Sequence, residues 1–455
     1  MADPSVPSRS PASPTNGHGQ DPSSPAKSLT LSAVLPPLIL GTATFNIQYV
    51  HDPTKLPVHD IIKRAFELGI RAFDTSPYYG PAEILLGEAI GAAVQGSNRT
   101  NNSSQPQQSP PPSPPPPPRY PRSSYLLISK AGRVGPTSFD YSPAAITASV
   151  HRSLERLRTP YLDLVYLHDV EFVTDADVLG AMPALWDLQR GGKVRHVGIS
   201  GYPIPRLLDL AEKIAALGGS SSSSRSGRTT TLDAVLSYCH CTVQNTTLAD
   251  PATLARFRAA GVDVVLNASI VGMGLLAPSI SVGPQGSWHP APEGLRAACV
   301  EMRAAAGDGN GSTLARVAIR FALETWGRAA AAAGLAVGGG GRGGSENKVG
   351  ATVIGVTSVE ELEETVEEWR SVVKDLGLRL EPESDEGSVG NGPPQPLVKV
   401  KDASGAGVEI AAGSSDVGEF VRRVLWPILG EWKDYSWESP PRGWFDAHHP
   451  SGGGT

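Results

Sequence analysis

The chain has 455 residues and a formal net charge of -6 at pH 7, with both signs spread along its length. Because no basic stripe is present, nucleic acid is not favoured as a partner. No apolar run reaches the about 20 residues that a membrane span needs, and the first residues lack a charged-then-apolar signal pattern, so we expect a soluble, cytoplasmic protein without membrane association.

Glycine and proline, at 50 and 41 residues, are more frequent than in an average globular protein. Much of the excess lies in low-complexity segments that cannot build a core: a tail at 1–33 and insertions near 95–121, 217–230, 327–348 and 378–413. We expect the tail to be disordered. The rest has the size of one (β/α)8 barrel, about 250 residues or more. We therefore expect a single domain over 34–440 and a flexible C-terminus at 441–455.

From about residue 38 to residue 374, short apolar runs alternate with amphipathic segments, as in βαβ units around a parallel sheet. Eight runs are candidate strands, at 37–41, 71–75, 124–129, 163–168, 194–199, 233–237, 262–267 and 351–355. An open doubly wound sheet also fits, but its first strand should precede a Gly-x-Gly-x-x-Gly turn, which residues 40–44 lack. The pattern favours an α/β fold, a closed TIM barrel.

Helices are predicted between the strands. Ser142 is a candidate N-cap before Pro143, which suits the first helical position. The residues that follow place apolar side chains on one face, as do the segments after the fourth and eighth strands. These stripes indicate packing against the barrel.

The three cysteines, Cys239, Cys241 and Cys299, argue against a disulfide framework and for a reducing compartment. Cys239-His240-Cys241 contains zinc-ligand types, but no second Cys/His pair at ligand spacing completes a site. We therefore expect no metal.

Ionisable side chains stand where three predicted strands stop. Asp74 and Tyr79 follow the second strand, Lys130 the third and His168 the fourth. Singly, each has a structural explanation, such as a turn cap, a solvated lysine or a satisfied histidine. In a barrel, however, the carboxyl ends of the strands meet at the face that carries the chemistry. We therefore interpret these residues as one catalytic unit.

Their chemistry suits hydride transfer, in which a proton leaves or reaches an oxygen as the hydride moves. A tyrosine, with a pKa of about 10, is a poor base near neutral pH, and a nearby ammonium stabilises its phenolate. We expect Lys130 to lower the pKa of Tyr79 in this way. Asp74 would hold Lys130 charged and oriented, and His168 would orient the substrate oxygen.

The segments Phe-Asp-Thr-Ser-Pro-Tyr-Tyr-Gly (73–80), Ile-Ser-Lys (128–130) and Tyr-Leu-His (166–168) resemble the Asp, Tyr, Lys and His motifs of the aldo-keto reductases. The resemblance covers about residues 36–374 and preserves the order of the motifs. It implies a nicotinamide-dependent oxidoreductase with Asp74, Tyr79, Lys130 and His168 as catalytic residues.

Two further segments, Gly-Ile-Ser-Gly-Tyr-Pro (198–203) and Leu-Ser-Tyr-Cys-His (236–240), are similar to the branch of NAD-dependent sugar dehydrogenases acting on D-arabinose or L-galactose. This resemblance implies oxidation of an aldose at C1 to its aldonolactone, with Tyr79 as the general base. D-Arabinose is the first substrate to expect.

The family resemblance also implies a set of cofactor contacts, namely Gly41, Thr42, Ser200, Gly201, Ser237, Ser269, Gly272, Gly274, Leu275, Gly355, Thr357, Ser358, Glu361 and Thr365. The chain departs from the family pattern around the nicotinamide. Gly201 replaces the usual Asn, Leu236 stands where a Gln is usual, and the Tyr expected after the seventh strand is missing from 268–272. The ring must therefore be held differently.

The segment at 355–365 resembles the family's adenosine-binding loop and contains no cation. A 2′-phosphate carries about two negative charges and favours Lys or Arg beside it. Glu361 would repel the phosphate but accept a ribose hydroxyl, although acidic residues also suit a helix N-terminus. We expect NAD rather than NADP.

Two alternatives stay open: an NADP-dependent carbonyl or pyridoxal reductase, and a regulatory subunit that binds the cofactor while docking to another protein. The C-terminal segment supplies Trp426, Trp432, Trp437 and Trp444, whose indole faces suit the apolar side of a sugar. The positions Phe420, Val424, Trp426 and Leu429 fit better a helix docked across the barrel.

Overall fold

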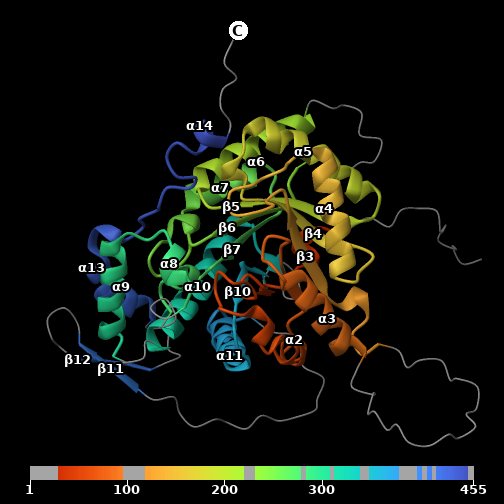
Figure 1. Ribbon diagram of the computed structural model, residues 1–455. Helices are drawn as coiled ribbons and strands as arrows, with labels where there is room; N and C mark the ends of the chain where they lie inside the picture. Colours follow the sequence, from red (N-terminus) through yellow and green to blue (C-terminus); the bar gives the residue numbers. More distant parts are fainter. Residues whose placement is uncertain are drawn as a thin grey trace, which may run out of the picture.

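The computed structural model describes residues 29–95, 118–219, 231–277, 283–307, 312–338, 348–378, 397–401, 407–411 and 417–448. Eight parallel strands form a closed barrel in the order β1-β10-β7-β6-β5-β4-β3-β2 (Figure 1). They are β1 (Leu38–Gly41), β2 (Ala72–Asp74), β3 (Leu126–Ala131), β4 (Leu162–His168), β5 (Val194–Gly201), β6 (Ala234–Tyr238), β7 (Val264–Ala268) and β10 (Ala351–Gly355). The predicted TIM barrel is confirmed, and each predicted strand end lies within two residues of its observed position.

Helices surround the barrel (Figure 1). The longer ones are α2 (Val58–Glu67), α3 (Ala82–Gln95), α4 (Pro143–Arg156), α5 (Asp175–Arg190), α6 (Ile204–Gly219), α7 (Pro251–Ala259), α9 (Glu293–Ala305), α10 (Ser312–Ala333) and α11 (Val359–Asp375). The short ones are α1 (Leu31–Val34), α8 (Gln285–Trp288), α12 (Val417–Phe420), α13 (Trp426–Leu429) and α14 (Trp444–His448). Two small hairpins pair β8 (Val337–Gly338) with β9 (Lys348–Val349) and β11 (Leu397–Lys401) with β12 (Gly407–Ala411). Among the described residues, no helix has the length and apolarity to cross a membrane.

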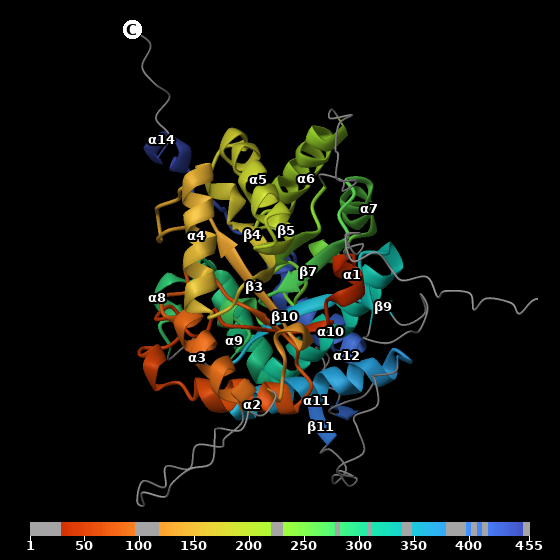
Figure 2. The same cartoon turned by 90° about the vertical axis from the view of Figure 1, so that its right-hand side faces the viewer.

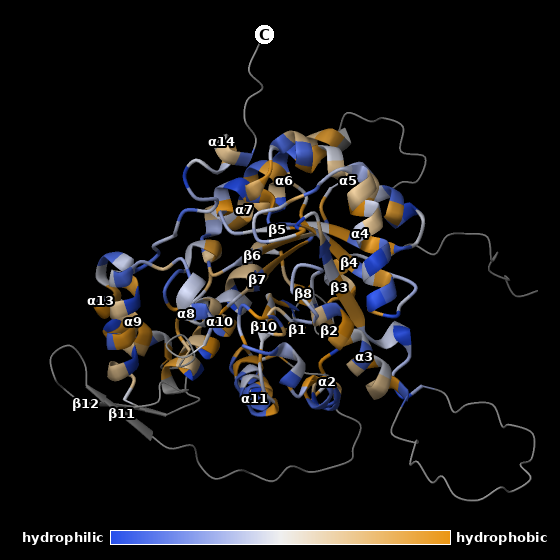
Figure 3. Ribbon diagram, viewed as in Figure 1, coloured by the Kyte–Doolittle hydropathy of each residue, from blue (hydrophilic) through white to orange (hydrophobic). Residues whose placement is uncertain are grey.

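The alternation of side chains along each strand separates the two parts of the core. Leu164 and Tyr166 of β4 belong to the cluster that fills the barrel, whereas Val165 and Leu167 pack with the surrounding helices. Successive side chains of a strand point to opposite faces, so one apolar strand serves both clusters. Figure 3 shows the strands as largely hydrophobic, with hydrophilic residues on the outer faces of the helices.

Helix α1 closes the amino-terminal end of the barrel, on the side opposite α8 and α14 (Figure 2). Leu31 and Leu35 are buried in the barrel cluster, and the backbone N–H of Ser32 donates to Asp263 at 2.8 Å. The expectation that the disordered tail extends to residue 33 is therefore wrong for residues 31–33. Leu31 and Leu35, four positions apart, lie on the same side of this segment and cover the open end of the barrel.

Two other boundaries also differ from the expectation. The expectation of a low-complexity insertion at 327–348 is wrong for residues 327–338. Helix α10 continues to Ala333, and Leu335 is buried beyond its end. The flexible C-terminus expected from 441 includes α14, where the Trp444 indole N–H donates to Phe172 O at 2.9 Å. The insertions expected near 95–121, 217–230 and 378–413 lie largely outside the described residues.

Candidate active site

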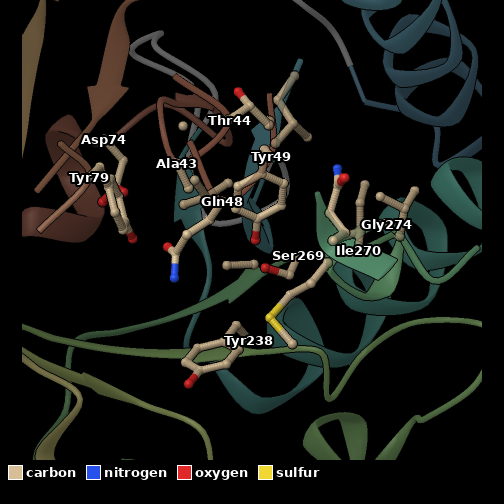
Figure 4. Close-up of a pocket in the computed structure, with 18 of the residues that line it drawn as sticks. Ala43, Thr44, Gln48, Tyr49, Asp74, Tyr79, Tyr238, Ser269, Ile270 and Gly274 are labelled. Atoms are coloured by element: carbon tan, nitrogen blue, oxygen red, sulfur yellow. The ribbon is translucent and has the colours of Figure 1, made fainter. Parts of the chain in front are cut away.

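A cavity of about 800 Å3 lies at the carboxyl ends of the barrel strands. Asp74 of β2, Lys130 of β3 and His168 of β4 line it, together with Tyr79 from the loop after β2. Figure 4 shows Asp74 and Tyr79 on one side of this cavity, with Tyr238 and Ser269 on other sides. The structure thus brings together the four residues that the sequence assigns to catalysis.

Lys130 and Asp74 form a buried ion pair next to Tyr79. The Lys130 ammonium donates to Asp74 Oδ1 at 2.5 Å and to Thr75 O at 2.9 Å, and the two paired side chains are only 2% and 5% exposed. Burial raises the pKa of Asp74, while the charge of Lys130 opposes that rise. Two acceptors therefore fix the position of the ammonium: the Asp74 carboxylate at the end of β2 and the backbone carbonyl of Thr75, the next residue.

Tyr79 lies half-buried beside this pair, with the Lys130 ammonium 4.8 Å from the centre of its ring. Burial raises the pKa of Tyr79 well above 10, and the carboxylates of Asp74 and Asp169 raise it further. The expected lowering of this pKa by Lys130 is thus wrong, because Asp74 sits next to the ammonium and burial disfavours the phenolate. The phenol is protonated at neutral pH.

His168 completes the group, with its ring edge-on to that of Tyr79 at a centroid distance of 5.7 Å. Burial lowers the pKa of His168 to about 3, so the imidazole is neutral. Its Nδ1 lies 3.1 Å from Ser76 Oγ, which itself accepts from the backbone N–H of Tyr78. In the tautomer that accepts from the Ser76 hydroxyl at Nδ1, the Nε2 atom carries the proton and can donate to a substrate oxygen.

The cofactor candidates divide into two groups. Eight line the cavity: Gly41, Ser200, Ser269, Gly274, Gly355, Thr357, Glu361 and Thr365. Six lie outside its lining: Thr42, Gly201, Ser237, Gly272, Leu275 and Ser358. Ser237 lies outside the lining because side chains alternate along a strand: its neighbour Leu236 faces the cavity, so Ser237 points away from it. The Ser237 hydroxyl instead lies 3.1 Å from His240 Nδ1.

Several aromatic residues of the lining were missed by sequence reasoning. Tyr238 follows Leu236 by two positions on β6 and so faces the same cavity, next to Ala268 of β7 in the sheet register. It offers an aromatic face near the position where the family Tyr is absent. Period-two alternation was the signal that could have found it.

Tyr49 and Trp288 connect the loop after β1 with the segment after β7. Their rings meet edge-on at 5.6 Å, and the Trp288 indole N–H donates to Gln48 O at 2.6 Å. All three residues line the cavity. No local pattern predicts this contact, because it joins segments about 240 residues apart.

At the other end of the cavity, Glu361 is held beside Thr357, whose backbone N–H and hydroxyl both donate to Glu361 Oε2, at 2.7 and 2.9 Å. The segment 355–365 carries no cation, but the fold brings Arg316 of α10 into the same lining. The Arg316 guanidinium donates to Glu368 at 2.7 Å and lies 3.7 Å from Glu367. The cation is thus already paired with carboxylates.

The C-terminal segment forms part of the cavity wall. Trp437 lines the cavity and stacks on Tyr202 at a centroid distance of 4.6 Å, and the backbone of Tyr435 accepts from Gln244 and Asn245 of the loop after β6. Of the four tryptophans considered from the sequence, only Trp437 lines this cavity. Phe420, Val424 and Leu429 are buried against α9 and α10, and Trp426 packs against that cluster, so the segment docks on these outer helices rather than across the barrel.

Comparisons with known proteins agree with this architecture. A sequence model of the Aldo/keto reductase family matches residues 37–375. The chain is 38% identical over 348 residues to D-arabinose 1-dehydrogenase of Saccharomyces cerevisiae, an alignment covering 76% of this chain and 87% of the yeast protein. It is 30% identical over 308 residues to L-galactose dehydrogenase of Arabidopsis thaliana, covering 67% of this chain and 75% of the plant protein.

Proposed function

Because the chain belongs to the aldo/keto reductase family, we propose that this oxidoreductase uses NAD to oxidise an aldose at C1 to the aldonolactone, with D-arabinose as the first candidate. The observation that carries the proposal is the grouping of Tyr79, His168 and the Lys130–Asp74 pair at one end of a strand-end cavity. The similarity to two sugar dehydrogenases supports the substrate class.

The residues around the cavity fit a nicotinamide dinucleotide. The cavity, at about 800 Å3, has the size of a cofactor site. The tetrad lines one part of it, while Glu361 and Thr365 at the start of α11 line another. When bound, the nicotinamide supplies the hydride acceptor for oxidation, or the hydride for reduction. Ser200, Ser269 and Tyr238 would hold that ring, in place of the family residues that the chain lacks.

The protein's own residues would manage the proton. His168 Nε2 donates a hydrogen bond to the reacting oxygen and fixes its position. Tyr79 removes the hydroxyl proton as the hydride leaves C1, so its phenolate form is required. Lys130 lies close enough to stabilise that phenolate, and Asp74 keeps the ammonium in place. The high pKa of Tyr79 implies that oxidation becomes faster as the pH rises.

The charge at the adenosine end supports NAD over NADP. Glu361 and Glu364 line this end of the cavity, and Arg316 is paired with Glu368. A 2′-phosphate brought here would be repelled by the carboxylates of Glu361 and Glu364, and the paired Arg316 could bind it only after giving up its own partner. The 2′-hydroxyl of NAD can instead donate to a carboxylate oxygen.

The second candidate is an NADP-dependent carbonyl or pyridoxal reductase. The observation that favours it is the protonated state of Tyr79, because reduction requires a proton donor to the carbonyl oxygen. Arg316 would then have to turn from Glu368 toward the phosphate.

The two candidates are separated by initial rates with D-arabinose, L-galactose, L-fucose and D-glucose, each with NAD and with NADP. NMR identification of the product then tests for a lactone. NAD-dependent formation of a lactone from one aldose supports the proposal. Absence of sugar oxidation, together with NADPH-dependent reduction of aldehydes, would replace it with the second candidate.

A further inference from the structure

A second polar array lies beside the tetrad. Its members come from the loops or ends of four successive strands: Gln48 after β1, Tyr78 after β2, Arg133 after β3 and Asp169 after β4, and all four line the cavity. The Tyr78 hydroxyl accepts from Gln48 Nε2 and from Arg133 Nη2, each at 3.0 Å. Arg133 Nη1 donates to Asp169 Oδ2. In Figure 4 the Gln48 side chain reaches into the cavity.

Burying the charges of Arg133 and Asp169 carries an unfavourable desolvation free energy. The side chains of Arg133 and Asp169 are 15% and 4% exposed, so both charges have lost most of their water. Burying an ion pair of this kind seldom adds stability, compared with apolar residues of the same volume. Asp169 also has a φ of 57°, a left-handed conformation that is uncommon outside glycine and often found at functional sites. The proton transfer described above uses neither residue.

The position of Asp169 relative to His168 suggests what the pair binds. Asp169 Oδ2 lies 3.6 Å from His168 Nε2, the atom that the proposed function assigns to the reacting oxygen. In a sugar, oxygens on adjacent carbons are separated by about 2.8 Å, close to one hydrogen-bond length. A hydroxyl next to the reacting carbon therefore comes within reach of the Asp169 carboxylate. Arg133 and the Tyr78 hydroxyl supply donors beside it.

We propose that Asp169 and Arg133 form a hydroxyl-recognition subsite for the carbon adjacent to the reacting one. The substrate class of the site is then the 2-hydroxy aldehydes, including aldoses in their cyclic form. The assignment rests on the proposed function only for the position of the reacting oxygen, between Tyr79 and His168. A charged acceptor in a water-poor site selects strongly for a hydroxyl, because a substrate that lacks it displaces water from the carboxylate without supplying a hydrogen-bond donor in its place.

The test compares two aldehydes that differ only in this hydroxyl, glyceraldehyde and 3-hydroxypropanal, reduced by purified full-length protein with NADH and with NADPH. We expect wild-type kcat/KM to favour glyceraldehyde by roughly 10- to 100-fold. Asp169→Asn, which keeps the shape of the side chain, should bring this ratio to within a few-fold of one. The readout is the ratio of the two kcat/KM values, because the Asp169 charge also acts on Tyr79 and His168 and so affects the rates with both aldehydes.

Arg133→Met provides a second variant with the same expected loss of preference, and thermal unfolding checks that both variants fold. Asp209→Asn is the matched control, because Asp209 pairs with Lys213 at 2.7 Å outside the cavity lining. An equal fall with both aldehydes in the folded Asp169→Asn variant would mean that Asp169 only supports His168, and would overturn the proposal. Equal wild-type rates for the two aldehydes, or no reduction of glyceraldehyde, would also overturn it.

This experiment does not depend on sugar oxidation. A wild-type protein that oxidises no aldose but prefers glyceraldehyde would contradict the proposed function and support the subsite. A protein that oxidises D-arabinose but treats the two aldehydes alike would do the reverse.

Discussion

Lys130 Nζ lies 2.5 Å from Asp74 Oδ1 in a pair that is almost completely removed from water. The geometry makes each charge depend on the other, because an unpaired buried charge is strongly unfavourable. It also fixes the ammonium 4.8 Å from the centre of the Tyr79 ring, the position from which the proposed mechanism has it stabilise the phenolate.

The first prediction follows from this pair. Asp74→Asn should lower kcat on the order of 100-fold and lower the free energy of unfolding by about 3 kcal/mol, because the Lys130 charge loses its partner. Steady-state kinetics and urea unfolding measure the two effects. The control is Asp187→Asn, which removes an exposed pair with Arg190 and should change stability by less than about 0.5 kcal/mol. An unchanged kcat in Asp74→Asn would show that the pair has no part in proton transfer.

Cofactor choice gives a second prediction. Glu361→Gln removes a negative charge that Thr357 holds at the end of the cavity where the proposed function places the adenosine. We expect kcat/KM with NADP to rise about tenfold relative to NAD, which corresponds to about 1.4 kcal/mol. Glu360→Gln, at an exposed position next to it and outside the lining, should leave the ratio unchanged. If both variants give the same ratio as the wild type, Glu361 does not discriminate between the cofactors.

A third prediction concerns Glu171, a buried carboxyl near the cavity. Its Oε1 accepts from the backbone N–H of Tyr202 at 3.1 Å and from the Ser439 hydroxyl at 3.2 Å, while burial raises its pKa to about 8. The folded protein thus retains a proton that the unfolded chain releases near pH 4.5. The stability that this proton provides is fully present below about pH 4.5, and it is lost as the pH rises through about 8.

The Gln side chain of Glu171→Gln does not titrate. The free energy of unfolding of this variant, relative to that of the wild type, should therefore increase by on the order of 1 to 3 kcal/mol as the pH rises from 5 to 9. Urea unfolding of both proteins at several pH values in this range measures the difference. Parallel stability curves would mean that Glu171 is already ionised in the folded protein at pH 5.

The sequence predicted the barrel and the tetrad because both follow from local rules. Apolar runs identify the strands, and a parallel barrel places every strand end on one face, so Asp74, Lys130 and His168 converge without any knowledge of tertiary contacts. Helix α1 was not predicted, because it is a short segment next to a polar tail. Leu31 and Leu35 become buried only by packing against the folded barrel.

The remaining features of the site depend on register or on distant contacts. A shift of one residue on β6 exchanges Ser237 for Tyr238 at the cavity, and the composition of the strand does not fix that register. Arg316 reaches the adenosine end from a helix that precedes the adenosine loop, and its pairing with Glu368 determines whether it is available. The high pKa of Tyr79 comes from burial and from the carboxylates of Asp74 and Asp169, whose positions relative to the phenol only the folded structure reveals.

The most direct test of the account is the initial rate of NAD reduction with D-arabinose, measured for wild type and for Tyr79→Phe between pH 7 and 9.5. NAD binding, followed by tryptophan fluorescence, provides the control. The account predicts a wild-type rate that increases with pH, a roughly 100- to 10,000-fold lower kcat in the variant, and unchanged NAD binding. A variant that binds NAD and retains a kcat within tenfold of wild type would contradict the assignment of Tyr79 as the proton-transferring residue.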